Sequence, residues 1–258
     1  MKNPTTTTQV QQTTMTTLRI KRILLPLNAQ RPSDGLLEQA ATMAARLQSE
    51  LCGLFIEDND LLNFAQLPVG REISFDTGRI QPSSITSMER SLRQIANRTQ
   101  QELSRLANHY KIQSQFVTRR GYTQQTLQAE LQIGDLLILS GIGSQANKTL
   151  LQQAYEYLHS DHHYLAWLPA GSAAIDGITV VQDSSSAADE SMQLANLLAT
   201  GSGHELSIQS YSTIDSLSDK LQRCKQGLWI VPYHPDWDIK VLEKLLANSR
   251  CPVLIVNT

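Results

Sequence analysis

The chain alternates short apolar runs with longer stretches in which apolar residues recur every three or four positions. Residues 22–28 read Arg-Ile-Leu-Leu-Pro-Leu-Asn and predict a buried strand that ends near Asn28. Apolar residues from Leu36 to Leu47 then predict an amphipathic helix, and residues 51–56 predict the next strand. Because a helix between two such strands normally makes a right-handed crossover between parallel neighbours, the sequence predicts an α/β fold with open parallel sheets.

The same alternation continues to residue 168. It predicts helices at 87–110, 123–131 and 149–159, and strands at 112–118, 135–140 and 164–168. A long irregular stretch separates the second strand from the first of these helices. Its loop from Asp58 to Ile73 carries Leu61, Leu62, Phe64, Leu67 and Val69. Such a loop could close over a cleft or bind a partner protein, or it could pack on its own domain.

The chain then repeats itself at an offset of 155 residues. Without a gap, this offset places Ile178 on Ile23 and Leu206 on Leu51. The second copy continues with helices through Leu217 and Val241 and strands at 228–231 and 253–256, but it lacks the long loop, the long helix and the third strand. We therefore expect a disordered Thr/Gln-rich tail at 1–17, a first domain at 18–171 and a shorter, four-stranded second domain at 172–258.

Charge and cysteine usage exclude several classes of function. The net charge is −2, and no Lys/Arg cluster predicts binding to nucleic acid or to an anionic membrane. Residues 1–17 contain no apolar run that could act as a secretory signal or membrane anchor, so we expect a cytoplasmic protein. Cys52, Cys224 and Cys251 are odd in number and far apart, which predicts core residues in a reducing compartment rather than a disulfide framework.

Motifs for covalent or metal chemistry are weak. His159, Asp161, His162 and His163 form the densest polar cluster, but the expected helix-to-strand turn would separate the histidines, so we predict no metal site there. The chain has no Gly-x-Ser-x-Gly motif and no cysteine beside a histidine in sequence. We therefore expect a protein that is not an enzyme.

Three segments carry a resemblance to a known family. They are Ile-Leu-Leu-Pro-Leu-Asn at 23–28, Val-Val-Gln-Asp-Ser-Ser-Ser at 180–186 and Cys-Pro-Val-Leu-Ile-Val at 251–256. Over residues 18–258 the chain resembles a tandem universal stress protein. The resemblance implies an α/β fold like those that bind adenine nucleotides, with strand order 3-2-1-4-5 and pairing through the last strands. Tandem members look like a dimer fused into one chain, so the strand at 164–168 would face that at 253–256 in an intrachain pseudo-dimer.

The resemblance also implies a nucleotide site, and this chain departs from its pattern. Family members that bind nucleotides have an Asp at the end of the first strand and a Gly-x2-Gly-x9-Gly-Ser/Thr loop after the fourth. Here Asn28 replaces the Asp, the glycines are spaced Gly-x-Gly, and Gln152 and Gln153 replace the Gly-Ser pair. The second half keeps Asp183, but residues 232–238 have no glycine and two acids, which would repel phosphate. The candidate nucleotide-binding residues are Pro26, Leu27, Asn28, Gly141, Gly143, Ser144 and Asp183.

Each candidate has a plainer interpretation. Gly141, Gly143 and Ser144 could form an ordinary strand-to-helix turn, and Asp183 could cap the following helix. The first hypothesis is therefore a non-enzymatic binding or regulatory module of the stress response with an impaired nucleotide site and no assigned cofactor. The alternative is an ATP or AMP sensor that uses the Gly141–Ser144 loop with main-chain contacts from Pro26 and Leu27. A third hypothesis is a weak nucleotide hydrolase. Whether two such chains pair further into a homodimer stays open.

Overall fold

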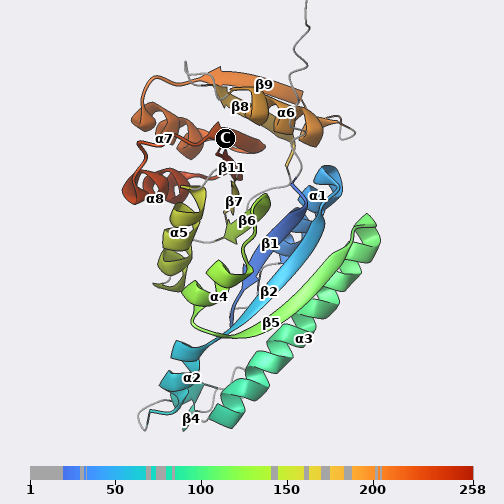
Figure 1. The fold of residues 1–258 in the computed structure, drawn as a ribbon, viewed down its shortest axis with the longest axis vertical. Coiled ribbons are helices and arrows are strands. Elements are labelled where there is room, and N and C mark those ends of the chain that lie inside the picture. The colour runs from blue at the N-terminus through green and yellow to red at the C-terminus, as the bar shows by residue number, and fades with distance from the viewer. Residues whose placement is uncertain are drawn as a thin grey trace, which may run out of the picture.

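The computed structural model describes residues 20–29, 32, 34–67, 71–73, 80–82, 85–140, 145–159, 163–169, 175–182, 188–200, 203 and 205–257. Nine strands form a single sheet in the order β5-β2-β1-β6-β7-β11-β10-β8-β9 (Figure 1). They are β1 (Arg22–Leu27), β2 (Glu50–Asp58), β5 (Ser114–Gly121), β6 (Asp135–Ser140), β7 (Tyr164–Leu168), β8 (Gly177–Gln182), β9 (Glu205–Ser210), β10 (Leu228–Pro232) and β11 (Val253–Val256). The α/β class is confirmed. The strands of both halves belong to one mostly parallel sheet, because β7 pairs with β11.

The junction between the halves is the pairing that the resemblance implied. Strand β7 runs antiparallel to β11, with Leu165 opposite Ile255, whereas every other neighbouring pair in this sheet is parallel. The first five strands lie in the implied order 3-2-1-4-5, with β5 as the third main strand. An edge-to-edge pairing between the last strand of each half therefore makes the sheet continuous.

The sequence repeat is also present in the strand register. Ile23 of β1 lies opposite Leu51 of β2, and Ile178 of β8 lies opposite Leu206 of β9. The offset of 155 residues thus relates two pairs of neighbouring strands in space. In the described part of the chain, the second half contributes four strands, β8 to β11, as predicted. The division into domains at residues 171 and 172 remains a prediction, and the tail at 1–17 lies outside the described residues.

Helices cover both faces of the sheet. The helices are α1 (Asp34–Leu47), α2 (Asn59–Ala65), α3 (Ile85–Tyr110), α4 (Thr123–Glu130), α5 (Gln145–Leu158), α6 (Ala188–Ala199), α7 (Ile214–Arg223) and α8 (Ile239–Asn248). One apolar core contains residues of α1, α3 and α6, and a second contains residues of α4, α5, α7 and α8. Successive strand residues alternate between the two cores, as Ile23 and Leu24 do. Both cores therefore extend across the junction between the halves.

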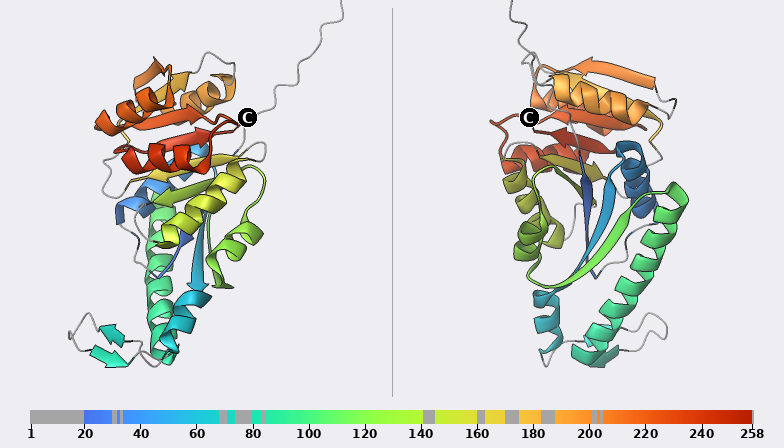
Figure 2. Two further views of the ribbon diagram at one scale, coloured as in Figure 1. Left: turned by 90° about the vertical axis from the view of Figure 1, so that its left-hand side faces the viewer. Right: turned by 45° about the vertical axis from the view of Figure 1, so that its right-hand side comes forward.

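The structure corrects the irregular stretch expected after the second strand. Strand β2 continues to Asp58, and the two-turn helix α2 begins directly after it. The side chain of Asp58 starts this helix, because its Oδ1 accepts a hydrogen bond from the backbone N–H of Asp60 at 2.8 Å. A small antiparallel hairpin follows, formed by β3 (Arg71–Ile73) and β4 (Ile80–Pro82). In both views of Figure 2, α2 and this hairpin lie at the opposite end of the molecule from β9.

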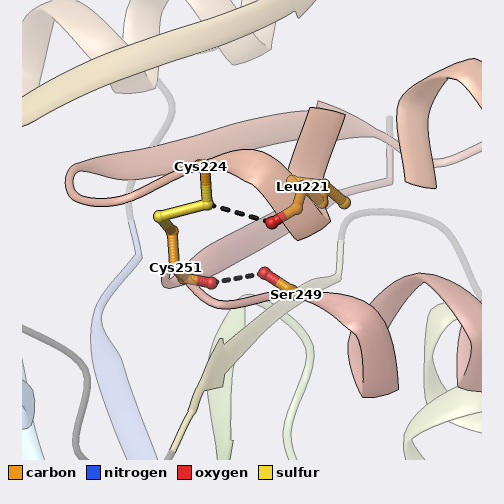
Figure 3. The surroundings of a disulfide bond; sticks show 4 residues. All are labelled: Leu221, Cys224, Ser249 and Cys251. Atoms are coloured by element: carbon orange, nitrogen blue, oxygen red, sulfur yellow. Dashed lines mark hydrogen bonds between the residues drawn. A yellow bond between two sulfur atoms is a disulfide. The ribbon is translucent and has the colours of Figure 1, made fainter. Parts of the chain in front are cut away.

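The cysteine prediction is also wrong. Cys224 and Cys251 form a disulfide with their Cα atoms 6.2 Å apart (Figure 3). Cys224 ends α7 and Cys251 precedes β11, where the Ser249 hydroxyl donates to the Cys251 carbonyl oxygen at 2.6 Å. The two residues are 27 positions apart, and their sequence spacing gives no sign of contact because β10 and α8 intervene. Only Cys52 is a free, buried thiol, so the cysteines give no argument for a reducing compartment.

In the part of the chain that the structure describes, none of the helices has the length and apolar character needed to span a bilayer.

Candidate functional site

A cavity of about 820 Å³ opens at the carboxyl ends of three neighbouring strands, β1, β2 and β5. In open α/β sheets this edge is where ligands bind, since the loops that leave parallel strands diverge there. Its described lining residues come from these strand ends and from α2, α4 and α5: Pro26, Leu27, Asn28, Ala29, Ile56, Asp58, Asp60, Leu61, Tyr122, Thr123, Gln124, Gln125 and Leu150. The volume suits a small organic molecule.

The cavity wall combines an apolar part with polar groups that can hydrogen-bond. Pro26, Leu27, Ile56, Leu61 and Leu150 supply the apolar surface. The side-chain amides of the lining are those of Asn28, Gln124 and Gln125, which can both donate and accept hydrogen bonds. Tyr122 is 45% exposed and lines the cavity, so its ring can contact a flat ligand. An uncharged molecule with one flat ring and several hydroxyl or amine groups fits this combination.

Asp58 fixes the geometry of the cavity. Its Oδ1 caps α2 through Asp60 N, and its Oδ2 accepts a hydrogen bond from the Thr123 hydroxyl at the start of α4. One carboxylate therefore joins the end of β2 to the first residues of two helices that line the cavity. Because each of its oxygens holds the start of one helix, Asp58 is a positioning residue and a source of negative charge.

Ion pairs next to the cavity hold the end of β5. Arg120 contacts Glu57 of β2 at 2.8 Å and Glu89 of α3 at 2.9 Å. Arg119 contacts Glu130 of α4 at 2.6 Å. Both arginines thus pair with carboxylates, and neither contributes to the described cavity lining.

The charged side chains in the described lining of the cavity are acidic. Among the lining residues that the structure describes, Asp58 and Asp60 are negative and there is no Lys, Arg or His. A phosphate group beside this described lining would meet two carboxylates and none of its residues would supply a cationic partner, which is unfavourable at short range. A neutral or cationic ligand does not meet this repulsion.

The structure brings together part of the candidate nucleotide site. Pro26, Leu27 and Asn28 all line the cavity. Gly141, Gly143, Ser144 and Asp183 lie outside the described residues. Tyr122 and Thr123 also line the cavity, although no sequence motif predicted a ligand role for them. The sequence could have indicated both residues, because they follow the third predicted strand. Its carboxyl end was expected at the same edge of the sheet as those of the first two strands.

Gln152 and Gln153 are not at a helix start. Helix α5 begins at Gln145, four residues before the predicted start, so both glutamines lie in its interior. The Gln152 and Gln153 side-chain amides donate to the two carboxylate oxygens of Glu156, at 3.1 and 3.0 Å. A Gly-Ser pair here would sit within a helix and could not form a loop around phosphates.

In the second half, buried aromatic side chains follow the strand β10. Tyr233 and Trp237, which follow β10, are 8% and 4% exposed and pack edge to face. The Tyr233 hydroxyl lies 2.9 Å from His159 Nδ1, and burial raises the pKa of Tyr233 to about 12. Asp238 caps α8 by accepting from Val241 N at 2.8 Å. Asp238, one of the two acids predicted to repel phosphate, therefore serves as a helix cap.

Comparisons with known proteins place the fold. No known family model matches the chain, and no curated protein matches it in sequence. A universal stress protein from Archaeoglobus fulgidus superposes with a TM-score of 0.61 at 13% identity, covering 93% of this chain and 98% of that one. A universal stress protein candidate from Pseudomonas aeruginosa gives 0.53 at 10%, and a protein of unknown function from the same species gives 0.54 at 11%. Each of these two alignments covers 91% of this chain and 92% of the other. The chain therefore has a fold like that of the universal stress proteins.

Proposed function

We propose that this chain, which has a universal stress protein-like fold, is a tandem, non-enzymatic regulatory module of the stress response that binds a small molecule without phosphate groups. The observation that carries the proposal is the charge of the cavity, whose described lining has two carboxylates and no basic side chain. A nucleoside has the flat ring and hydroxyl groups that the lining suits, and it lacks the negative charges of a nucleotide. We infer adenosine as the first ligand to test, because the resemblance implies adenine recognition.

The absence of covalent chemistry is part of the proposal. A nucleotide hydrolase positions its substrate with cationic groups or a metal ion and activates water with a base. In the cavity, Asp58 already accepts hydrogen bonds from Asp60 N and the Thr123 hydroxyl. This arrangement supports a holding role for the carboxylate rather than proton transfer.

Helix α2 supports the proposed regulatory role. Asp60 and Leu61 of this helix line the cavity, whereas Phe64, one turn later, is 53% exposed and Leu67 just beyond it is 48% exposed. A ligand that contacts the first turn of a two-turn helix can shift or order the second turn. We therefore propose that a partner protein detects the ligand at the segment from Asp58 to Ile73, which contains α2.

The ATP or AMP sensor remains the second candidate. It is favoured by the position of the cavity, because Pro26 and Leu27 lie where the resemblance places main-chain contacts to a nucleotide. The two candidate functions predict opposite effects of phosphate groups on binding affinity. Phosphate groups should strengthen binding to a sensor and weaken binding to the acidic cavity proposed here.

Calorimetric titration of nucleotide-stripped protein with adenosine, and with ATP and Mg²⁺, tests the proposal. We expect adenosine to bind with Kd in the micromolar range, about −8 kcal/mol. Ala29→Trp should abolish this binding by filling the cavity, whereas Ile133→Trp, at a residue 83% exposed and outside the lining, should retain it. ATP that binds while adenosine does not would support the sensor. No heat with either ligand up to millimolar concentration would overturn both.

A further inference from the structure

Strand β9 forms an edge of the nine-stranded sheet that the described residues leave uncovered. It pairs with β8 on one side, and no described strand lies on its other side. Figure 1 shows it at the top of the molecule. Of its six residues, Glu205, Ser207, Ile208 and Ser210 are exposed. The outward backbone N–H and C=O groups of such a strand are free to pair with another chain.

In the first half, the strand equivalent to β9 is covered by a further strand and a helix. By the offset of 155 residues Ile208 corresponds to Gly53 of β2, and the two occupy the same register, opposite Val180 and Leu25 respectively. Gly53 is covered by Phe116 of β5 and Leu103 of α3, so closely that a methyl group there would lie 3.1 to 3.4 Å from their side chains. Ile208 is 56% exposed, and none of the described residues covers it as Phe116 and Leu103 cover Gly53. The second half thus presents a large apolar side chain where the first half has a neighbouring strand and helix.

The sequence of β9 does not protect the edge. Exposed edge strands are usually blocked by Lys, Pro, a bulge or a covering helix. At the opposite edge, β5 carries Arg119 and Arg120 and is contacted by α3. Strand β9 reads Glu-Leu-Ser-Ile-Gln-Ser, with a single charge at its first residue and no proline. Its six residues are therefore suited to forming a further strand pair.

The charges at the two ends of β9 complement each other. Glu205 is exposed at the amino end. At the carboxyl end Lys220 of α7 donates to the Ser210 carbonyl oxygen at 2.8 Å and to Gln209 Oε1 at 3.3 Å. If two β9 strands run antiparallel, the Glu205 end of each lies beside the Lys220 end of the other. An extended peptide of arbitrary sequence would lack this match.

We propose that β9 is a dimerisation edge at which a second copy of this chain adds its own β9 in antiparallel orientation, around a two-fold axis at Ile208. The two Ile208 side chains then face each other, Ser207 lies opposite Gln209, and the sheet continues from one copy into the other. The same kind of antiparallel edge pairing already joins β7 to β11 within the chain. Because the shared edge is short, the dimer has a micromolar Kd rather than a nanomolar one.

Sedimentation velocity of the full chain over a concentration series tests this proposal. The wild type dimerises, and Ile208→Lys weakens the dimer by about tenfold or more, because two ammonium groups then face each other across the axis. Ile133→Lys is the matched control, since Ile133 is 83% exposed and lies in the first half. A thermal melt of each variant checks that the fold is retained.

A second readout is independent of that substitution. In the Ile208→Cys variant, mild oxidation with copper phenanthroline joins the facing thiols into a covalent dimer, because directly opposed residues of antiparallel strands are close enough for a disulfide. The Ile133→Cys variant does not cross-link. A wild type that stays monomeric into the high micromolar range overturns the proposal. A dimer that Ile208→Lys leaves unchanged, with no cross-link at position 208, overturns it as well.

Discussion

Ile255 of β11 lies directly opposite Leu165 of β7, and the two side chains belong to the same apolar core. This pair stands in the antiparallel junction where the strands of the two halves meet. Ile255 is 1% exposed and Leu165 is fully buried. The core that contains them also includes residues of α5 and α8, one helix from each half. The halves are thus linked by shared apolar packing as well as by backbone hydrogen bonds.

Truncation at the junction should destabilise the whole molecule. Ile255→Ala removes buried methyl groups and should lower the free energy of unfolding by about 3 kcal/mol, in a single urea transition. Ile133→Ala, at an exposed isoleucine, should change it by less than about 0.5 kcal/mol. Two separate transitions in the wild type, or equal effects of the two substitutions, would show that the halves unfold independently.

The Cys224–Cys251 bond should stabilise the second half. It closes a loop with a sequence separation of 27 residues, which corresponds to about 3.5 kcal/mol in the chain-entropy account. Urea unfolding with and without dithiothreitol measures this contribution. A Cys224→Ser/Cys251→Ser variant should match the reduced wild type and show no further response to the reductant. A thiol assay on unfolded, unreduced protein should detect Cys52 alone, and detection of all three cysteines would contradict the disulfide.

Cys52 should make the protein less stable in alkaline solution. Burial raises the pKa of its thiol from the ordinary value of 9.0 to about 11. Because the folded-state pKa is the higher one, the stabilisation is present below pH 9 and is lost as the pH rises through 11. Between pH 8 and 10 the unfolding free energy of the wild type should fall by about 1 kcal/mol more than that of Cys52→Ala. Parallel pH profiles for the two proteins would refute this contribution.

Asp58 should support the cavity through its two hydrogen bonds. Asp58→Ala removes the cap of α2 and the bond from Thr123, and we expect a loss of about 1 to 2 kcal/mol in unfolding free energy. Adenosine binding should weaken in the same variant, because α2 and α4 lose their shared anchor. Asp236→Ala serves as the control, since that carboxylate is 90% exposed. Unchanged stability and binding in Asp58→Ala would remove Asp58 from the site.

The sequence was sufficient for the fold class because local patterns carry that information. Apolar runs such as Leu136–Leu139 predict buried strands, and the repeat predicted which strands would share a register. The single sheet was harder to predict from pattern alone, since the pairing of β7 with β11 joins residues that are 86 to 92 positions apart in the sequence. The disulfide was missed for the same physical reason. Neither Cys224 nor Cys251 has a local motif, and the packing of α7 against α8 brings the ends of these two helices, and with them the two cysteines, together.

The candidate site was predicted in part. The position of Asn28 was predictable, because ligands bind at the carboxyl ends of parallel strands and the first strand was expected to end at this residue. The acidic character of the cavity did not follow, because Asp58 and Asp60 were assigned to an irregular loop and not to the end of β2 and the start of α2. An earlier start for α5 was also not predicted. Its first residues lack a strong apolar period, so the boundary depends on tertiary packing.

The ratio of the dissociation constants for ATP and adenosine tests the central claim most directly. In the wild type at low ionic strength, adenosine should bind about tenfold more tightly than ATP, because phosphates approach Asp58 and Asp60 without a described basic partner in the lining. Asp60→Asn and added salt should each bring the ratio closer to one. ATP that binds more tightly than adenosine, with a ratio unaffected by Asp60→Asn, would contradict the proposed phosphate-free ligand.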